Sequence, residues 1–263
     1  MQDFGYESPL LTEVAWTEWT TDEAACRPPR VALNLGPLLN SALPKGISKG
    51  EVLLVIGSPG VGKSRLALSM CPSAVGGYFF VSTVSEMDKN LLLDMASELA
   101  CLDQGIKSVD GADRSTVLAA IRDAGRSRHT EFPPLVVVDS LLGISSPSQQ
   151  SSVLWELKSA AKDAGVALVV MSGNHATGAA AGPRSVLHAA DYTVALSLAP
   201  RPSVRLLTAV KSRRSPAPVS VGVEHTEAGL VAIDLDSEEA EFASGTAVLS
   251  DTAIVVATIA DSE

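Results

Sequence analysis

The sequence predicts an α/β fold built on a mostly parallel central sheet with helices on both faces. The 263 residues are 46% hydrophobic and 4% aromatic, which is enough apolar content for one large core and excludes a mostly disordered chain. From Val31 onward, short β-branched apolar runs alternate with longer helix-like stretches. That alternation is typical of parallel strands connected by helices.

The strands are expected where aliphatic residues form short continuous runs, and the helices in the segments between them. The expected parallel strands are 51–56, 78–82, 135–139, 167–172 and 192–197, and the expected helices are 63–70, 89–102, 115–124 and 151–164. In the last helix, apolar residues recur at intervals of three and four, which places them on one face. Consecutive strands then follow at 205–210, 219–223 and 230–233, so we expect antiparallel strands to extend the sheet.

Charge divides the chain into a nearly neutral body and two acidic ends. The net charge is −10, of which residues 1–30 carry −4 and residues 236–263 carry −7. Residues 31–235 are left with +1. We therefore expect an acidic N-terminal arm at 1–30, a core at 31–235 and an acidic C-terminal tail at 236–263. Because charges in salt solution act over about 10 Å, the acidic ends do not exclude a polyanionic ligand on the body.

The cysteines and the N-terminus indicate a cytoplasmic protein without membrane association. The chain begins with no basic segment followed by an apolar one, and its longest apolar runs fall short of the roughly 20 residues that span a bilayer. Cys26, Cys71 and Cys101 have no zinc-site spacing. We expect them to be reduced residues that pack in the interior.

The most specific motif is a glycine-rich turn between the first predicted strand and the first predicted helix. It reads Gly-Ser-Pro-Gly-Val-Gly-Lys-Ser at 57–64 and matches GxxxxGK[ST], with the flanking strand and helix that this phosphate-binding pattern requires. Glycines let backbone N–H groups wrap a phosphate closely. In this pattern Lys63 reaches the β- and γ-phosphates, and the Ser64 hydroxyl ligates Mg²⁺. The candidate nucleotide-binding residues are Gly57, Ser58, Pro59, Gly60, Val61, Gly62, Lys63, Ser64 and Arg65.

A second metal anchor is expected at the end of another strand. Residues 135–138 are aliphatic and Asp139 follows them, which indicates a buried strand with a carboxylate at its carboxyl end. We expect Asp139 to lie beside the glycine-rich turn, where it holds Mg²⁺ directly or through water. Ser64 and Asp139 are therefore the candidate metal ligands, and ATP and Mg²⁺ are the expected cofactors.

With these two motifs, the chain resembles the RecA-superfamily ATPases, and within them the core of the bacterial RadA/Sms branch, with DnaB-type helicases and KaiC as related families. The resemblance covers about residues 31–235 and implies a RecA-like P-loop NTPase fold. The further segments that carry it are Pro-Lys-Gly-Ile-Ser-Lys-Gly-Glu-Val at 44–52, Val-Asp-Ser at 138–140, Gly-Pro-Arg at 182–184 with His188 and Asp191, and Leu-Leu-Thr-Ala-Val-Lys-Ser-Arg at 206–213.

The resemblance implies roles for two cations and one polar loop. Lys211 and Arg213 match residues that reach into the nucleotide site of a neighbouring subunit, where a cation stabilises charge on the γ-phosphate. Residues 184–214 hold six basic side chains and one acidic one; the other interpretation is a solvated basic face. The loop after the fourth core strand lines the DNA path in this superfamily, and either Asn174 or His175 would be its γ-phosphate sensor.

Two positions depart from the family pattern. RadA-like chains follow the second strand with Ser-Gly-Glu-Glu, whose glutamate polarises the attacking water, whereas this chain has Val-Ser-Thr-Val-Ser-Glu-Met at 81–87. Glu86 therefore arrives about two residues late. If the loop bulges, Glu86 is the catalytic base; if it does not, nucleotide binding remains and hydrolysis falls by about 10²–10⁴. Arg214 stands where the family usually has an aromatic residue.

These expectations combine into a Mg²⁺-dependent ATPase that acts on DNA in recombination, repair or strand handling. The resemblance implies a ring or filament of identical subunits, with a hexamer expected, that binds single-stranded DNA through central loops. One alternative is a KaiC-like regulatory or assembly protein that is gated by nucleotide and does not bind DNA. Another is a scaffold that binds ATP with little hydrolysis.

The two acidic ends each leave two interpretations open. The N-terminal arm contains Trp16 and Trp19 and is either a docking segment for a protein partner or a loose leader. The C-terminal tail is either a solvated end with an edge strand or a segment that competes with DNA for a basic surface.

Overall fold

The computed structural model describes residues 31–83, 89–99, 101–102, 105–127, 131–173, 184–201, 203–214, 219–226, 229–235 and 240. The expected arm at 1–30 and all of the expected tail except Ala240 lie outside the described residues. So do three candidate site residues: Glu86, Asn174 and His175.

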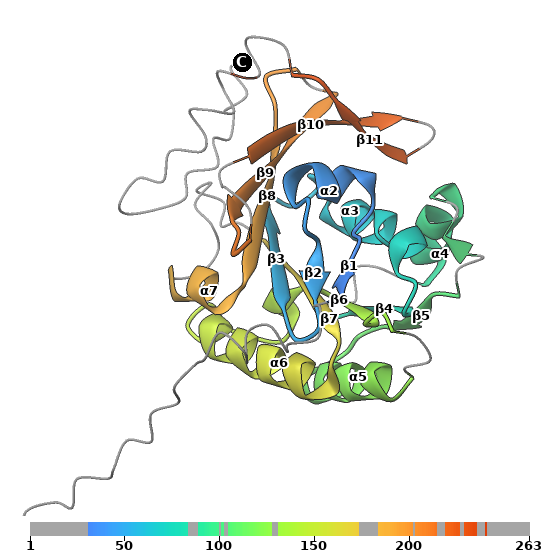
Figure 1. Ribbon diagram of the computed structural model, residues 1–263, viewed down its shortest axis with the longest axis vertical. Coiled ribbons are helices and arrows are strands. Elements are labelled where there is room, and N and C mark those ends of the chain that lie inside the picture. Colours follow the sequence, from blue (N-terminus) through green and yellow to red (C-terminus); the bar gives the residue numbers. More distant parts are fainter. Residues whose placement is uncertain are drawn as a thin grey trace, which may run out of the picture. The chain divides into compact units, whose positions relative to one another are not determined.

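A nine-stranded sheet forms the centre of the described fold (Figure 1). Its order is β11-β10-β9-β8-β3-β7-β6-β4-β5. The strands are β3 (Val52–Gly57), β4 (Tyr78–Ser82), β5 (Lys107–Val109), β6 (Leu135–Asp139), β7 (Ala167–Gly173), β8 (Tyr192–Leu198), β9 (Val204–Lys211), β10 (Val219–Thr226) and β11 (Gly229–Ile233). Neighbouring strands from β5 to β8 pair in parallel, whereas β8 to β11 pair antiparallel. The predicted fold class, a parallel α/β sheet extended by C-terminal antiparallel strands, is confirmed.

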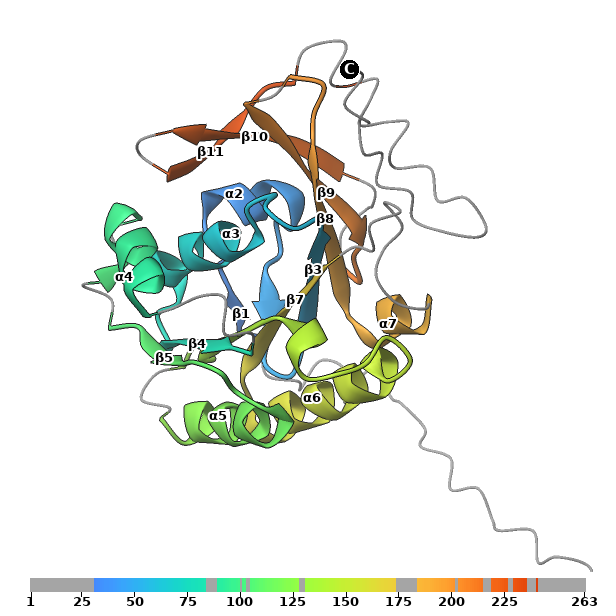
Figure 2. The same cartoon turned by 180° about the vertical axis from the view of Figure 1, so that it is seen from behind.

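Helices cover both faces of this sheet (Figures 1 and 2). The α-helices are α2 (Pro37–Ala42), α3 (Lys63–Ser69), α4 (Lys89–Glu98), α5 (Arg114–Arg126), α6 (Gln150–Ala164) and α7 (Arg184–Ala189), and the 3₁₀ turns are η1 (Cys71–Ser73) and η3 (Leu141–Gly143). Helices α2, α3 and α4 pack on one face, and α5, α6 and α7 pack on the other. None of the described helices is long and apolar enough to cross a bilayer.

Strand β3 illustrates why the core strands are aliphatic throughout. All six of its residues are buried. Leu53 and Val55 join the apolar cluster under α2 and α3, whereas Leu54 and Ile56 join the cluster under α5 and α6. Successive side chains of a strand point to opposite faces, so a strand covered on both faces needs an apolar residue at every position.

The C-terminal antiparallel strands pack against the helices on the face that carries α2 and α3. Strands β10 and β11 contact α2, and β11 also contacts α3 (Figure 2). Leu207 of β9 and Val223 of β10 are buried in the same apolar cluster as α2 and α3. The helix that carries the lysine of the glycine-rich turn is therefore packed between the parallel strands and the C-terminal strands.

The elements that the sequence pattern did not predict are all short. They are β5, α2, α7, the turns η1 and η3, and the two-stranded sheet of β1 (Ala32–Leu33) and β2 (Ile47–Ser48). The three residues of β5 are exposed at the sheet edge, so no aliphatic run marks them. The helix expected at 89–102 ends at Glu98.

Candidate functional site

The glycine-rich turn runs from the end of β3 into the start of α3, and geometry favours glycine at all three of its glycine positions, including Gly60 with φ of 75°. A Cβ at Gly57 would lie 2.5 Å from the carbonyl oxygen of Leu196 and 2.9 Å from Cγ1 of Val61, which is closer than real contacts allow. Gly62 precedes α3 with φ of 104°, in the left-handed region that favours glycine. The turn can therefore lie close to β8 and still lead directly into α3.

Three of the predicted site residues meet at this turn. The Lys63 ammonium donates hydrogen bonds to the carbonyl oxygens of Gly57 and Ser58, both at 2.9 Å. The Ser64 hydroxyl donates to Oδ2 of Asp139 at 2.5 Å. Lys63, Ser64 and Asp139 line one cavity of about 550 Å³. Its other lining residues are Pro59, Gly60, Ser82, Leu91, Ser140, Leu142, Gly143 and Gly173.

The electrostatics of the cavity reflect burial of two opposite charges. Burial lowers the pKa of Lys63, and the nearby Asp139 carboxylate partly offsets this effect. Burial also raises the pKa of Asp139, against the hydrogen bond from Ser64 and the charge of Lys63. Each charged form is thus disfavoured by lost hydration and supported by its neighbours. An anion beside Lys63 and a cation beside Asp139 would each stabilise the charged form.

The oxygen atoms at this point suit a hard divalent cation. Ser64 and Asp139 present a hydroxyl and a carboxylate, the ligand types that Mg²⁺ takes in sites completed by substrate phosphates and water. Among the described residues, no group of three or more His, Cys, Asp or Glu could hold a metal without such help. The residues present therefore fit a Mg²⁺–nucleotide complex better than a metal ion bound by protein alone.

The side chain of Arg65, predicted from the motif as a nucleotide-binding residue, contacts other elements of the fold. Its guanidinium pairs with Glu98 of α4 and contacts the ring of His225 in β10. Arg65 is not among the residues that line the cavity. Its contacts instead connect α3 to α4 and to the C-terminal strands.

Lys211 and Arg213, the finger residues predicted to reach the nucleotide site of a neighbouring subunit, lie at the opposite end of the parallel strands from the glycine-rich turn. Lys211 pairs with Thr193 near the start of β8, and Thr193 also pairs with Leu54. From Leu54 the strand rises three residues, or about 10 Å, to Gly57. Lys211 and Arg213 therefore lie toward the amino ends of the parallel strands, whereas the glycine-rich turn lies at their carboxyl ends.

The contacts of these two cations differ. The Lys211 ammonium donates to the carbonyl oxygens of Leu187, His188 and Ala190, at 2.8, 3.3 and 2.6 Å, which holds it against the end of α7. Burial and the charge of Arg213 lower its pKa. The Arg213 side chain is 55% exposed and pairs through Nε with Asp191 at 3.0 Å. Arg213 is thus the more accessible of the two.

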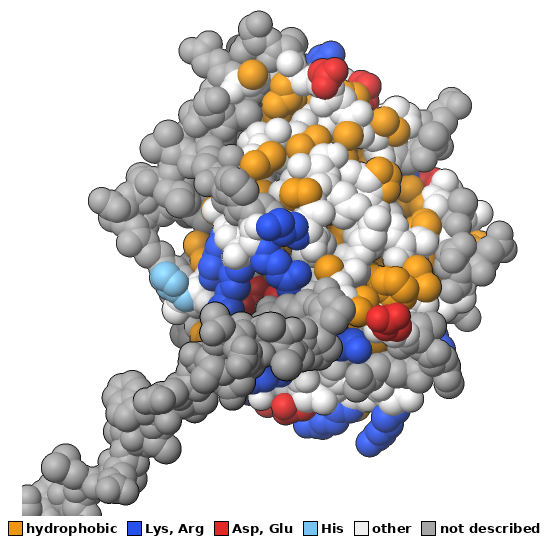
Figure 3. Space-filling model, in the orientation of Figure 1, with side chains coloured by type: hydrophobic (Ala, Val, Ile, Leu, Met, Phe, Trp, Pro, Cys, Tyr) orange, Lys and Arg blue, Asp and Glu red, His pale blue; other side chains and the backbone are white. Residues whose placement is uncertain are grey.

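One further cation pairs with the same buried carboxylate, and another pairs with Glu51. Lys158 of α6 pairs with Asp191 at 2.8 Å. Arg214, at the family's aromatic position, hydrogen-bonds Ser48 and pairs with Glu51. Figure 3 shows Lys and Arg side chains gathered on one face of the molecule, beside acidic ones. The positive charge of these Lys and Arg side chains is therefore partly neutralised by Asp191 and Glu51.

Sequence reasoning missed Thr83, which directly follows β4. Its hydroxyl accepts a hydrogen bond from the N–H of Ser140, and its own N–H donates to the carbonyl oxygen of Asp139. The position just beyond a parallel strand, at the edge that carries the glycine-rich turn, was the available signal. The leucines at the cavity, Leu91 and Leu142, are 47% and 42% exposed and have no such signal.

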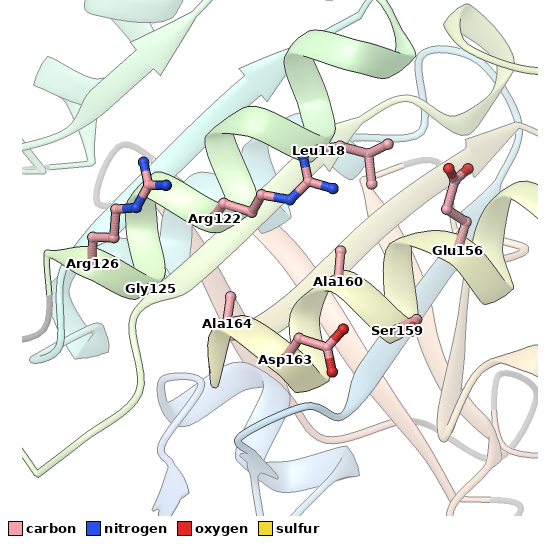
Figure 4. A pocket seen from close by; sticks show the side chains of 9 residues that line it. All are labelled: Leu118, Arg122, Gly125, Arg126, Glu156, Ser159, Ala160, Asp163 and Ala164. Atoms are coloured by element: carbon pink, nitrogen blue, oxygen red, sulfur yellow. The ribbon is translucent and has the colours of Figure 1, made fainter.

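A second hollow lies between α5 and α6 and has a volume of about 520 Å³. Figure 4 shows Arg122 and Arg126 projecting from α5, and Glu156 and Asp163 from α6. Small residues of both helices also line it, among them Gly125. None of the predicted site residues that the structure describes lines this groove, so the cavity at the glycine-rich turn is the candidate site.

Comparison with known proteins finds DNA repair proteins named RadA. The chain is 30% identical to RadA of Bacillus subtilis over 196 residues, which cover 70% of this chain and 41% of that protein. For RadA of Helicobacter pylori J99 the identity is 28% over 203 residues, or 73% and 44%; for Mycobacterium tuberculosis H37Rv it is 30% over 187 residues, or 66% and 38%. The chain thus spans about two fifths of the length of these curated relatives. No protein-family model matches it.

Among solved structures, the crystal structure of the RadB recombinase has the same fold. It superposes with a TM-score of 0.59 over 77% of this chain and 100% of that chain, at 19% sequence identity. The RadA-like sequence and this shared fold together show that the chain belongs to the RecA superfamily and carries a RadA/RadB-like core.

Proposed function

We propose that the chain binds ATP with Mg²⁺ in the cavity between the glycine-rich turn and Asp139, and hydrolyses it. The observation that carries this proposal is the convergence of Lys63, Ser64 and Asp139 on one cavity. The cavity lies at the carboxyl ends of the parallel strands, where open α/β sheets bind their ligands. The RadA-like sequence supports the same activity.

In this proposal each residue has one chemical task. Lys63 neutralises the terminal phosphates, and Ser64 and Asp139 hold Mg²⁺, which when bound neutralises charge on the β- and γ-phosphates. Glu86 is the proposed base that orients the attacking water. Asn174 or His175 is the proposed sensor of the γ-phosphate.

We further propose that Arg213 and Lys211 complete the nucleotide site of a neighbouring subunit. Their position at the opposite sheet edge supports action on another copy, because the turn of the same chain lies beyond the far end of β3. Arg213 is exposed and suits direct contact with the γ-phosphate, whereas Lys211, which donates to three backbone carbonyl oxygens, suits support of that edge. Such head-to-tail contacts produce a ring or a filament, and we propose a hexamer.

The proposed substrate of the assembly is single-stranded DNA, handled in repair or recombination in the cytoplasm. The names of the relatives, a DNA repair protein and a recombinase, support this role. The nearly neutral charge of residues 31–235 is compatible with this role, because the acid is concentrated in the predicted end segments.

The test begins with binding of a fluorescent ATP analogue with and without Mg²⁺. Lys63→Ala should abolish binding, whereas Lys45→Ala, at an exposed lysine away from the cavity, should leave it unchanged. Phosphate release is then measured with and without single-stranded DNA, alongside particle size with and without ATP. Wild-type protein that binds no ATP, or Lys63→Ala protein that binds it normally, would reject the proposal.

One second function is favoured by a specific observation. The acids of the Ser-Gly-Glu-Glu pattern are missing from their expected places, which favours a scaffold that binds ATP with little turnover. Glu86→Gln separates the two: it should slow phosphate release at least about 100-fold if Glu86 is the base and change nothing if it is not. Hydrolysis that does not respond to DNA, with assembly that does respond to ATP, would instead support a KaiC-like regulatory protein.

A further inference from the structure

Thr83 makes an unusual set of contacts where β4 and β6 end. Its N–H donates to the carbonyl oxygen of Asp139 at 2.7 Å. The N–H of Ser140 donates to Oγ1 of Thr83 at 2.8 Å, and Oγ1 donates to the carbonyl oxygen of Ser140 at 2.5 Å. One threonine therefore binds backbone groups of two successive residues, the first of which is the candidate metal ligand.

The Thr83 hydroxyl binds the backbone just beyond the last paired residues of β4 and β6. Strands β4 and β6 pair in parallel, and their last paired residues are Ser82 and Asp139. Thr83 is one residue beyond this pair, and its side chain occupies both the N–H and the C=O of Ser140. A hydroxyl offers one donor and two acceptor positions, so this group can hold both. Valine has the same shape and could hold neither.

Gly143 closes the other side of this contact. A Cβ at Gly143 would lie 2.7 Å from the carbonyl oxygen of Thr83 and 2.8 Å from its Cβ, so the turn η3 passes directly against Thr83. Gly143 and Ser140 line the cavity of the glycine-rich turn, whereas Thr83 does not. Thr83 thus lies behind the cavity wall and touches residues that face the ligand.

We propose that Thr83 is a positioning residue for Mg²⁺: by clamping residues 139–140 it fixes the direction of the Asp139 carboxylate. The inference rests on the proposed function and deepens it. The carboxylate meets the Ser64 hydroxyl at 2.5 Å, so a small rotation of the backbone at Asp139 would separate the two oxygen ligands. Groups that orient metal ligands in this way typically change metal affinity by about 10–100-fold when they are removed.

The test measures metal binding directly, with Mn²⁺ as the probe and the fraction of free Mn²⁺ read by electron paramagnetic resonance in the presence of ADP. Thr83→Val should weaken Mn²⁺ binding by about 10–100-fold. Thr83→Ser, which keeps the hydroxyl, should restore binding to within about threefold of wild type. ADP affinity without metal should stay within about twofold for both variants, because neither change touches the residues that contact phosphate. Asp139→Asn is the reference for complete loss of the protein carboxylate.

A structural role alone gives a different result. If Thr83 only stabilises the fold, Thr83→Val should lower the melting temperature and reduce ADP affinity equally with and without metal, which overturns the inference. Wild-type Mn²⁺ binding in a folded Thr83→Val protein also overturns it. If Thr83→Val does not fold, Gly143→Ala approaches the same contact from the opposite side. A metal-specific loss in that variant supports the inference, and an unchanged Mn²⁺ affinity rejects it. Wild-type protein that binds no ADP would reject the proposed function itself.

Discussion

Replacing Asp191 with alanine is expected to destabilise the protein by about 3–5 kcal/mol, the usual cost of removing one partner from a buried ion pair. The Asp191 side chain is 3% exposed and is an acceptor for three groups. Its Oδ2 accepts the N–H of Val52 at 3.0 Å. Its Oδ1 accepts Nζ of Lys158 at 2.8 Å and Nε of Arg213 at 3.0 Å.

The magnitude follows from how well each donor can find another partner. Val52 is fully buried, and leaving its N–H unpaired costs about 1–3 kcal/mol. Lys158 is 16% exposed and keeps the carbonyl oxygen of Ala189 at 3.1 Å, so the lost charged hydrogen bond contributes about 1.5–3 kcal/mol. Arg213 is 55% exposed and can turn to water, so its contribution is at most about 1 kcal/mol.

The assay is urea unfolding followed by circular dichroism for the wild type, Asp191→Ala and Asp191→Asn. Asparagine keeps an oxygen for the Val52 N–H but has no charge, so Asp191→Asn should be about 1–3 kcal/mol more stable than Asp191→Ala. The matched control is Asp163→Ala, at an exposed acid of α6, which should change stability by less than about 0.5 kcal/mol.

Two results would refute this reasoning. A loss below about 1 kcal/mol for Asp191→Ala would mean that the network contributes no more than an exposed ion pair. Equal stability of Asp191→Ala and Asp191→Asn would mean that the hydrogen bond to Val52 has no measurable value.

Three further predictions concern the site and one helix. Arg213→Ala should reduce ATP turnover by about 10³-fold or more and leave the nucleotide affinity of isolated subunits nearly unchanged; equal loss of both would contradict the finger role. Gly57→Ala should destabilise the fold by about 1–3 kcal/mol, because the added Cβ would lie 2.5 Å from the Leu196 carbonyl oxygen; melting at the wild-type temperature would contradict this. Hydrogen bonds from Thr116 lower the pKa of Asp113, the cap of α5, to about 2. The folded pKa lies below the unfolded one, so Asp113 stabilises above about pH 4 and loses this effect as the pH falls toward 2. Asp113→Ala should therefore melt below wild type at pH 7 and match it near pH 2, and a constant difference across a pH series of melts would show that the carboxylate charge is not responsible.

The parallel core was predictable because its strands are buried on both faces. That burial demands continuous aliphatic runs such as 135–138, and both ends of each of the five predicted parallel strands lie within one residue of the observed ends. Strand β5 and helices α2 and α7 were not predictable in this way. They are short, and no periodic run marks them, so contacts with the rest of the fold determine where they form.

The candidate site shows the same division. The phosphate-binding motif and the aspartate after an aliphatic strand predicted that Lys63, Ser64 and Asp139 would act together, and they line one cavity. Arg65 was assigned to the ligand because it follows the motif; its side chain contacts α4 and β10, and its role at the ligand stays a prediction. A neighbour in sequence turns about 100° along a helix, so adjacency within a motif does not keep side chains on one side.

The sequence by itself determined the strand core and the phosphate-binding turn, because both depend on local patterns: apolar residues at every strand position and glycines where the backbone bends. Only the tertiary structure decided that Thr83 contacts the residues after β6 and that Lys211 and Arg213 lie at the far edge of the sheet. These placements depend on sheet order and strand direction, which bring together residues dozens of positions apart and leave no mark in any short segment.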